Sequence, residues 1–258
     1  MKLRINDLEF AYPGIQVLSD VTCMIEPGML VAVTGTNGAG KSTFIKCLNR
    51  ILESRGTILL DGIDMHTLGR KEIAKRMAYM SQKYANAFPT SVFDMVLTGR
   101  FPHREWCRKH AEDEAKVSEV LEMLHLTPLA FREFDELSGG QQQKVLIARA
   151  LVQEADVLLL DEPVSSLDIR HQLEVMEVAK VLVRDHQKSV IIAIHDLNLA
   201  SRYADKVIML YEGKVYREGT PDKVLTADVI EQVYGVTVKI QKNGGRPMII
   251  PLEPVHAR

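Results

Sequence analysis

A glycine-rich loop between an apolar run and an amphipathic segment constrains the fold of this chain more than any other feature. Leu30–Thr34 is predicted as a buried strand, and residues 41–51 are predicted as a helix. The expected apolar face of that helix consists of Phe44, Ile45, Leu48 and Ile51. Between strand and helix lies Gly35-Thr36-Asn37-Gly38-Ala39-Gly40-Lys41-Ser42, which fits G-x-x-x-x-G-K-[ST]. A strand, this loop and a helix in that order predict a phosphate-binding site.

The residue types of the loop explain how it would hold phosphate. Glycines let backbone N–H groups turn toward phosphate oxygens, and the helix N-terminus adds partial positive charge. Lys41 supplies a mobile cation, Ser42 is the expected hydroxyl ligand of Mg²⁺, and Thr43 is a further candidate contact. A glycine-rich turn with a chance lysine is the alternative interpretation. The strand and helix on either side favour the phosphate site.

A pair of acidic residues follows a second buried strand. Val157–Leu160 is predicted as that strand and leads into Asp161-Glu162, while Val190–Ile194 is predicted as a third strand. Open α/β sheets bind ligands at the carboxyl ends of their strands. Asp161 therefore fits a Mg²⁺ ligand, and Glu162 fits a general base that orients the water attacking a γ-phosphate. Taken alone, the pair would be better explained as solvating a strand end.

A second anion-binding device is predicted at Leu137-Ser138-Gly139-Gly140-Gln141. The segment precedes an apparent helix, so a hydroxyl and two glycine amides would lie at a helix N-terminus. Two such helix ends in one chain indicate either two anions or one anion held between two copies. The second option implies a dimer.

The arrangement of apolar residues indicates an α/β chain. Short apolar runs alternate with helical patterns, whereas residues 91–151 read mainly as helices. The clearest helical spacing there is formed by Val117, Val120, Leu121 and Leu124. We expect this stretch to be a helical subdomain inserted between two halves of the core. Residues 211–215 are predicted as a hairpin that turns at Glu212-Gly213.

Charge and composition limit the partners of the chain. The 32 basic and 34 acidic residues give a net charge of −2, which argues against a surface adapted to nucleic acid. No apolar run approaches the ~18–20 residues of a membrane-spanning helix, so the chain is expected to stay in the cytoplasm. Cys23, Cys47 and Cys107 are far apart and odd in number, which favours small core residues over a disulfide framework or zinc site.

The motifs together resemble those of ATP-binding cassette (ABC) ATPase subunits. Walker A corresponds to Gly35–Ser42, the LSGGQ signature to Leu137–Gln141, and Walker B ends at Asp161-Glu162. Weaker matches follow in the family's order at Tyr12, Gln82, residues 165–168 and His195. The similarity covers nearly the whole chain and is carried by the ordered set.

The resemblance implies a fold and its division. We expect an α/β P-loop NTPase (RecA-like) core with an inserted α-helical subdomain and a small N-terminal antiparallel β region, together forming one ABC ATPase domain over residues 1–258. The expected parts are a nucleotide-binding core at 1–88 and 152–234, a helical subdomain with the signature at 89–151, and a short C-terminal extension at 235–258.

Several single residues take roles from the resemblance. Tyr12 would stack on adenine, although a surface tyrosine beside a Pro13-Gly14 turn is a fair alternative. Gln82 would sense Mg²⁺ and the attacking water, and His195 would hydrogen-bond the γ-phosphate. With Lys41 and Glu162, these two complete the expected catalytic set. The residues expected to reach the nucleotide of a second copy, or to join the two sites, are Ser138, Gly139, Gly140, Gln141 and Asp168.

Three segments resemble the ATPases of iron-siderophore, haem and cobalamin importers: residues 91–103, 167–172 and 195–200. The resemblance implies ATP and Mg²⁺ as cofactors, integral membrane permease subunits as partners, and an indirect link to a substrate-binding protein. The chain would then lie at the cytoplasmic face of the membrane, held by the permease. Residues 100–103 would shape the surface where the permease docks; a helix end terminated by Gly99 and Pro102 explains them equally well.

Two other functions stay open. Molybdate or tungstate importers have similar cassettes, and a soluble ABC ATPase could act as an ATP-switched assembly scaffold. Val164 departs from the family pattern, which usually has threonine there, but this removes no assigned catalytic group. The leading interpretation is an ATP hydrolase that energises uptake of a metal chelate.

Overall fold

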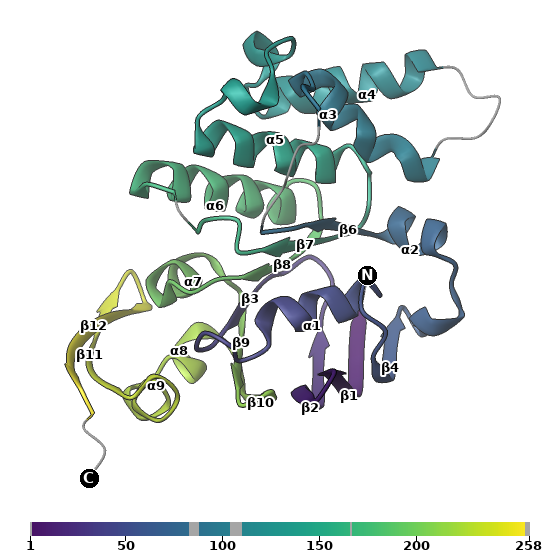
Figure 1. Ribbon diagram of the computed structural model, residues 1–258. Coiled ribbons are helices and arrows are strands. Elements are labelled where there is room, and N and C mark those ends of the chain that lie inside the picture. The colour runs from purple at the N-terminus through teal and green to yellow at the C-terminus, as the bar shows by residue number, and fades with distance from the viewer. Residues whose placement is uncertain (1, 83–87, 104–109, 166, 256–258) are drawn as a thin grey trace.

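A six-stranded, mostly parallel sheet forms the centre of the molecule (Figure 1). The structure is a computed structural model that describes residues 2–82, 88–103, 110–165 and 167–255. The strand order is β10-β9-β3-β8-β7-β6. The strands are β3 (Leu30–Thr34), β6 (Met77–Met80), β7 (Val157–Asp161), β8 (Ser189–Ala193), β9 (Lys206–Tyr211) and β10 (Lys214–Gly219). All neighbouring pairs are parallel except β10 with β9 at one edge.

The central strands are mostly apolar because both faces of the sheet are covered. Every residue of β3, β7 and β8 is buried. Side chains alternate along a strand, so Val31 and Val33 join one hydrophobic core while Leu30 and Ala32 join the other. A continuous apolar run is what a parallel strand buried on two faces requires.

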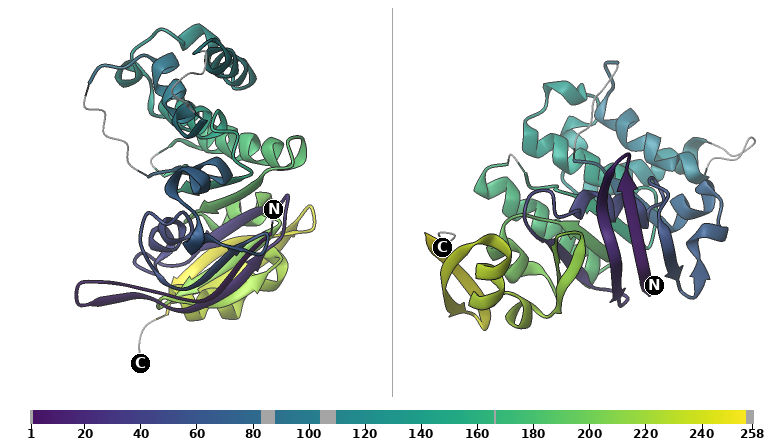
Figure 2. Two further views of the ribbon diagram at one scale, coloured as in Figure 1. Left: turned by 90° about the vertical axis from the view of Figure 1, so that its right-hand side faces the viewer. Right: turned by 60° about the horizontal axis from the view of Figure 1, so that its bottom comes forward.

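The first core lies between the parallel sheet and an antiparallel sheet near the N-terminus. The helix α1 (Lys41–Leu48) packs in this core with Phe44, Ile45 and Leu48 fully buried. The antiparallel sheet has the order β2-β1-β4-β5. Its strands are β1 (Leu3–Tyr12), β2 (Ile15–Ile25), β4 (Arg55–Leu60) and β5 (Ile63–Asp64). In the left view of Figure 2, the β1–β2 hairpin extends beyond the rest of the molecule.

The second core joins the opposite sheet face to a layer of helices, which lies at the top of Figure 1. The helices are α3 (Val92–Leu97), α4 (His110–Met123), α5 (Gly139–Leu151) and α6 (Ile169–Arg184), with 3₁₀ turns at Thr98–His103, Thr127–Leu129 and Phe134–Glu136. Before this layer, the 3₁₀ turn Met65–Thr67 and α2 (Arg70–Arg76) lead into β6. The described residues between 92 and 151 are thus mostly helical, and the division into core and subdomain stays a prediction.

The C-terminal part forms a hairpin that packs on α7 (Leu197–Tyr203). The C-terminal part comprises α8 (Pro221–Val224), α9 (Ala227–Tyr234), β11 (Val236–Asn243) and β12 (Arg246–Pro254), and the last two strands form the hairpin. The Asn198 amide pairs with the backbone of Ile249 in both directions, at 3.1 and 2.8 Å. Arg246 donates to the carbonyl of Ser201 at 3.0 Å and to that of Ala204. The hairpin is therefore fastened to the helix that begins directly after Asp196.

Several local predictions are confirmed and one helix end is wrong. The first strand matches, the second continues one residue further to Asp161, and the third lies one residue earlier at both ends. Glu212-Gly213 turns the β9–β10 hairpin. The predicted helix 41–51 ends at Leu48 because Arg50 adopts a left-handed conformation, φ 52°, which leaves Ile51 46 % exposed.

The two described cysteines are core residues. Cys23 and Cys47 are buried, and burial raises the pKa of each thiol to about 12. Cys107 lies outside the described residues. Among the residues that the structure describes, no helix has the length and apolar character needed to cross a membrane.

We expect Phe44→Ala to lower the free energy of unfolding by about 3–5 kcal/mol, because the ring is fully buried between the two sheets. Urea unfolding followed by circular dichroism measures this loss. Phe131→Ala is the matched control: that ring is 89 % exposed, so the change should stay within about 0.5 kcal/mol. Equal losses for both variants would contradict the assigned core.

Candidate functional site

Four neighbouring parallel strands deliver the predicted catalytic residues to one edge of the sheet. The strand β3 leads into the glycine-rich loop, β7 ends at Asp161, β8 is followed by His195, and β6 is followed by Gln82. Because the strands are parallel and adjacent, their carboxyl ends meet at the same edge. Residues separated by more than 150 positions in the sequence thereby become neighbours.

The glycine-rich loop needs glycine for two physical reasons. Gly35 and Gly40 have φ values of 143° and 97°, which side-chain-bearing residues rarely adopt. A Cβ on Gly35 would also lie 2.2 Å from the carbonyl oxygen of Leu210, and one on Gly40 would lie 2.7 Å from Leu18. The neighbouring strands therefore fix the path of the loop, which brings it to the N-terminus of α1.

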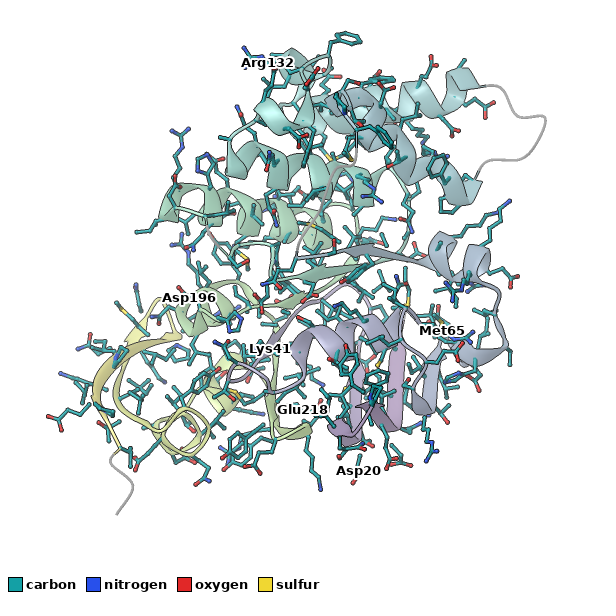
Figure 3. All side chains as sticks on the ribbon, in the orientation of Figure 1. Asp20, Lys41, Met65, Arg132, Asp196 and Glu218 are labelled. Carbon is teal, nitrogen blue, oxygen red and sulfur yellow. The ribbon has the colours of Figure 1, made fainter. Side chains whose placement is uncertain are left out.

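Lys41 bridges the loop from the first position of α1. Its Nζ donates to the carbonyl oxygens of Gly35 at 3.0 Å and Thr36 at 2.8 Å. Burial lowers the pKa of Lys41, while the carboxylates of Glu162 and Asp161 act in the opposite direction. A pocket of about 290 Å³ lies here, and its lining includes Asn37, Gly38, Gly40, Lys41, Ser42, Thr43, Glu162 and His195. Figure 3 labels Lys41 and, beside this region, Asp196, which follows His195 in the sequence.

Ser42 lines the pocket and is hydrogen-bonded to Asp161 at the end of β7. The Ser42 hydroxyl donates to Asp161 Oδ1 at 2.6 Å, and the carboxylate is only 1 % exposed. Tyr79 of β6 contacts the other carboxylate oxygen at 3.3 Å, and burial raises the pKa of its phenol. Tyr79 is not among the residues predicted for the site, because the sequence pattern predicts neither β6 nor its register.

Glu162 is held between two of the predicted residues. Gln82 Nε2 donates to Glu162 Oε2 at 2.6 Å, and His195 Nε2 lies 2.5 Å from Glu162 Oε1. Glu162 has φ 53°, a left-handed conformation that costs free energy for a residue with a side chain. The bend turns the chain immediately after β7 and brings the carboxylate between residues that follow the two neighbouring strands.

The signature segment forms a helix N-terminus but lies apart from this pocket. Ser138 caps α5, and its side chain and that of Gln141 each bond the backbone of the other, at 3.4 and 3.1 Å. Asp168 caps α6 in the same manner by accepting from the backbone of His171 at 2.9 Å. Neither cap is among the described residues that line the pocket.

Tyr12 lies at the end of β1 on the projecting hairpin. It is 41 % exposed, and its ring meets that of Phe10 edge to face at 4.9 Å between centroids. Val17 of the same hairpin lines the pocket, whereas Tyr12 is not among the lining residues described. The structure thus brings the hairpin to the site, and contact of Tyr12 with a nucleotide stays a prediction.

A groove of about 380 Å³ lies beside the segment that carries Gln82, and it divides the predicted docking residues. Its lining includes Tyr79, Ser81, Phe101 and Pro102, and Phe101 is 57 % exposed. Arg100 is only 4 % exposed, so its predicted place on the docking surface is wrong.

Arg100 instead lies in the interior, between Gly99 and Phe101, which line the groove. Its guanidinium pairs with Asp113 at 2.8 Å and Glu154 at 2.6 Å, and it donates to the carbonyl of Val152 at 2.7 Å. Lys116 pairs with Glu154 at 2.9 Å, so the two cations hold the pKa of Glu154 below its ordinary value against the opposing effect of burial. The cluster ties the turn after α3 to α4 and to the end of α5.

Comparison with known proteins agrees with this geometry. The sequence profile described as ABC transporter matches residues 18–165, more than half of the chain. The chain belongs to the ABC transporter family. Its fold is that of the ATP-binding cassette, and the chain is an ATP-binding ATPase.

Relatives match the ABC cassette over nearly its full length. An uncharacterised ABC transporter ATP-binding protein of Methanocaldococcus jannaschii is 44 % identical and covers 98 % of each chain. The ferric enterobactin transport ATP-binding protein of Escherichia coli is 36 % identical over 97 % of this chain and 94 % of its own. The petrobactin import ATP-binding protein of Bacillus anthracis is 35 % identical over 96 % and 92 %.

Solved structures of ABC transporters and their cassettes also match most of this chain. An inward-facing ABC transporter, provisionally assigned to the metal-chelate type, matches with a TM-score of 0.84 and 28 % identity over 97 % of each chain. A dimeric ATP-binding cassette in a post-hydrolysis state with ADP and Pi matches with a TM-score of 0.74 and 28 % identity, over 85 % of this chain and 98 % of its own.

We expect Arg100→Met to lower the free energy of unfolding by about 3–5 kcal/mol, because it leaves the buried Asp113 carboxylate without its cation. Asp113→Leu in the same chain removes that charge and should restore part of the loss. Urea unfolding of the three proteins measures both effects. A single variant as stable as the wild type would contradict the structural role of the cluster.

Proposed function

We propose that this chain is the ATP-hydrolysing subunit of an importer, and that it energises uptake of an iron chelate, haem or cobalamin through a separate membrane permease. The observation that carries the proposal is the contact of Glu162 with both Gln82 and His195. It joins the reacting end of the nucleotide pocket to the segment beside the exposed groove. ATP hydrolysis and partner binding would therefore be linked through one side chain.

ATP would occupy the pocket with its phosphates on the glycine-rich loop. Backbone N–H groups at the start of α1 and the Lys41 ammonium supply positive charge to the β- and γ-phosphates. Lys41 would exchange its bonds to the Gly35 and Thr36 carbonyls for phosphate oxygens. Tyr12 would stack on adenine from the β1–β2 hairpin.

The residue types of Ser42 and Asp161 fit Mg²⁺. The Ser42 hydroxyl and the Asp161 carboxylate are oxygen ligands within 2.6 Å of one another, and Mg²⁺ is commonly bound by one or two carboxylates with substrate phosphates. Bound there, the ion would neutralise charge developing on the phosphates. Gln82 would contribute its amide oxygen as a further ligand.

Hydrolysis would depend on Glu162. In phosphoryl transfer the protein contributes mainly positioning and charge stabilisation. The Glu162 carboxylate would orient and polarise the attacking water, while His195 would turn its ring to the γ-phosphate. Both groups already lie in contact at the pocket, at 2.5 Å. Gln82 would link the presence of nucleotide in this site to the groove.

A second copy would complete the site. Ser138, Gly139, Gly140 and Gln141 form a helix N-terminus suited to a phosphate, yet they lie outside the pocket of their own chain. We therefore expect each signature to bind the γ-phosphate held by the partner, with Asp168 joining the two sites. ATP would close the dimer, and hydrolysis would reopen it.

The permease would dock on the groove that contains Phe101 and Pro102. The named relatives that act in ferric enterobactin and petrobactin transport support a chelate importer. A substrate-binding protein would deliver the chelate outside, and this chain would lie at the cytoplasmic face of the membrane. Molybdate or tungstate import is the alternative within transport, and an ATP-switched assembly scaffold is the alternative outside it.

We expect Glu162→Gln to bind ATP yet to lose hydrolysis by about 10²-fold or more, because the carboxylate that polarises water is gone. With ATP and Mg²⁺ the variant should accumulate as a dimer, which light scattering detects. Lys41→Ala is the matched control and should fail to dimerise. If Glu162→Gln keeps wild-type turnover, or stays monomeric at saturating ATP, the proposed mechanism is wrong.

We expect Phe101→Glu to lose the permease while keeping ATP-driven dimerisation, because it places a charge in the docking groove. The tagged chain is co-expressed with candidate permease subunits and purified in detergent. Phe131→Glu, an exposed ring outside that groove, should retain the permease. A wild-type chain that purifies without any integral membrane partner would exclude the transporter, whereas a Phe101→Glu chain that keeps it would exclude only this docking surface.

A further inference from the structure

A side chain at position 140 would clash with another residue of the same chain. Gly140 is helical and has no positive φ, so its backbone conformation does not require glycine. A Cβ there would lie 2.1 Å from Cδ2, 2.4 Å from Cγ and 2.8 Å from Nε2 of His171. All of these atoms belong to the imidazole ring. Its neighbour Gly139 differs, because a Cβ on Gly139 would meet Leu167 at an ordinary 3.8 Å.

The His171 ring is fixed on its other side by Asp168. The ring Nδ1 lies 2.8 Å from Asp168 Oδ1, and the backbone N–H of His171 donates to the same oxygen at 2.9 Å. Because the carboxylate only accepts, Nδ1 carries the proton in this pair. These bonds hold the pKa of Asp168 below its ordinary value. The ring therefore lies between Asp168 and Gly140 with little freedom to turn.

The same two helices are also joined one turn further along. Lys144 of α5 pairs with Glu174 of α6 at 2.7 Å. This ion pair keeps the helices together, but it permits some variation in their spacing because both side chains are long. The close approach is set where a flat ring meets a residue without a side chain.

We propose that His171 is a positioning residue that fixes the N-terminus of α5 relative to that of α6, so that the signature and Asp168 reach the second copy's nucleotide together. The inference rests on the proposed ATP-bridged dimer and deepens it. Neither helix end lines the pocket of its own chain, so the spacing between them affects the dimer and leaves ATP binding to the single chain unchanged.

The proposal predicts that His171→Ala, a large-to-small change, compensates for Gly140→Ala, a small-to-large change. Gly140→Ala drives a methyl group into the ring, and we expect it to lower kcat by about tenfold or more. His171→Ala removes the three atoms nearest to the new methyl group, so the two helices lose their fixed spacing and kcat falls, with KM for ATP within about twofold of wild type. The combined variant should recover at least to the level of His171→Ala alone, a coupling of about tenfold.

Two further variants separate positioning from general packing. His171→Phe keeps a flat ring against Gly140 and loses the bond to Asp168, and it should retain more ATP-driven dimer than His171→Ala. Gly139→Ala combined with His171→Ala should show additive losses, because Gly139 does not touch the ring. Dimer formation is measured by light scattering in the Glu162→Gln background with ATP and Mg²⁺, and kcat in the Glu162 chain. Circular dichroism melting confirms that each variant folds.

The outcomes distinguish the inference from the function on which it rests. If the Glu162→Gln chain itself forms no dimer with ATP, the proposed function fails. If that dimer forms but Gly140→Ala is no better with His171→Ala than without it, the glycine is required elsewhere and His171 does not position it. Should Gly140→Ala fail to fold, His171→Phe still decides: dimer formation no better than that of His171→Ala would overturn the role of the ring.

Discussion

The parallel pairing of β6, β7, β8 and β3 is the constraint from which the rest of this molecule follows. Parallel neighbours end at one edge, so whatever follows each strand must share that edge. The chain uses this to bring together the phosphate loop, the Asp161-Glu162 pair, His195 and Gln82. A change of strand order would separate them, however well each motif was preserved. The buried faces of the sheet fix the register, because a slip by one residue would exchange the two cores.

The contacts at this edge couple nucleotide and partner surfaces. Glu162 is bonded to Gln82, and the residues just before Gln82 line the groove on the helical layer. Arg100, which lies between groove-lining residues in the sequence, is paired with Asp113 and Glu154 in the interior. On the other side of the sheet edge, α7 begins after His195 and is fastened to the C-terminal hairpin. A change in the hydrogen bonds of the Glu162 carboxylate can therefore affect several elements.

Much of the site could be predicted from the sequence, because its chemistry is local. The phosphate loop, the strand before it and the acidic pair each depend on adjacent residues. Two expectations failed, each for its own reason. Ile51 was placed in the core because the apolar spacing continued, yet the left-handed Arg50 ends the helix. Arg100 is expected at a docking surface because residues 91–103 resemble importer ATPases, yet Asp113 and Glu154 accompany it into the interior.

Two other residues carried no sequence signal for the contacts they make. Tyr79 reaches Asp161 only because β6 pairs with β7, and the ring of His171 meets Gly140 only because α5 packs on α6.

The central claim is that one chain supplies the pocket and another supplies the signature. It is tested most directly by a crystal structure of the Glu162→Gln chain with ATP and Mg²⁺. The account predicts two chains, with Ser138 and Gly140 of one within about 3 Å of the γ-phosphate bound at Lys41 of the other. A nucleotide enclosed by one chain alone, or a dimer whose signature segments lie away from the phosphates, would contradict it.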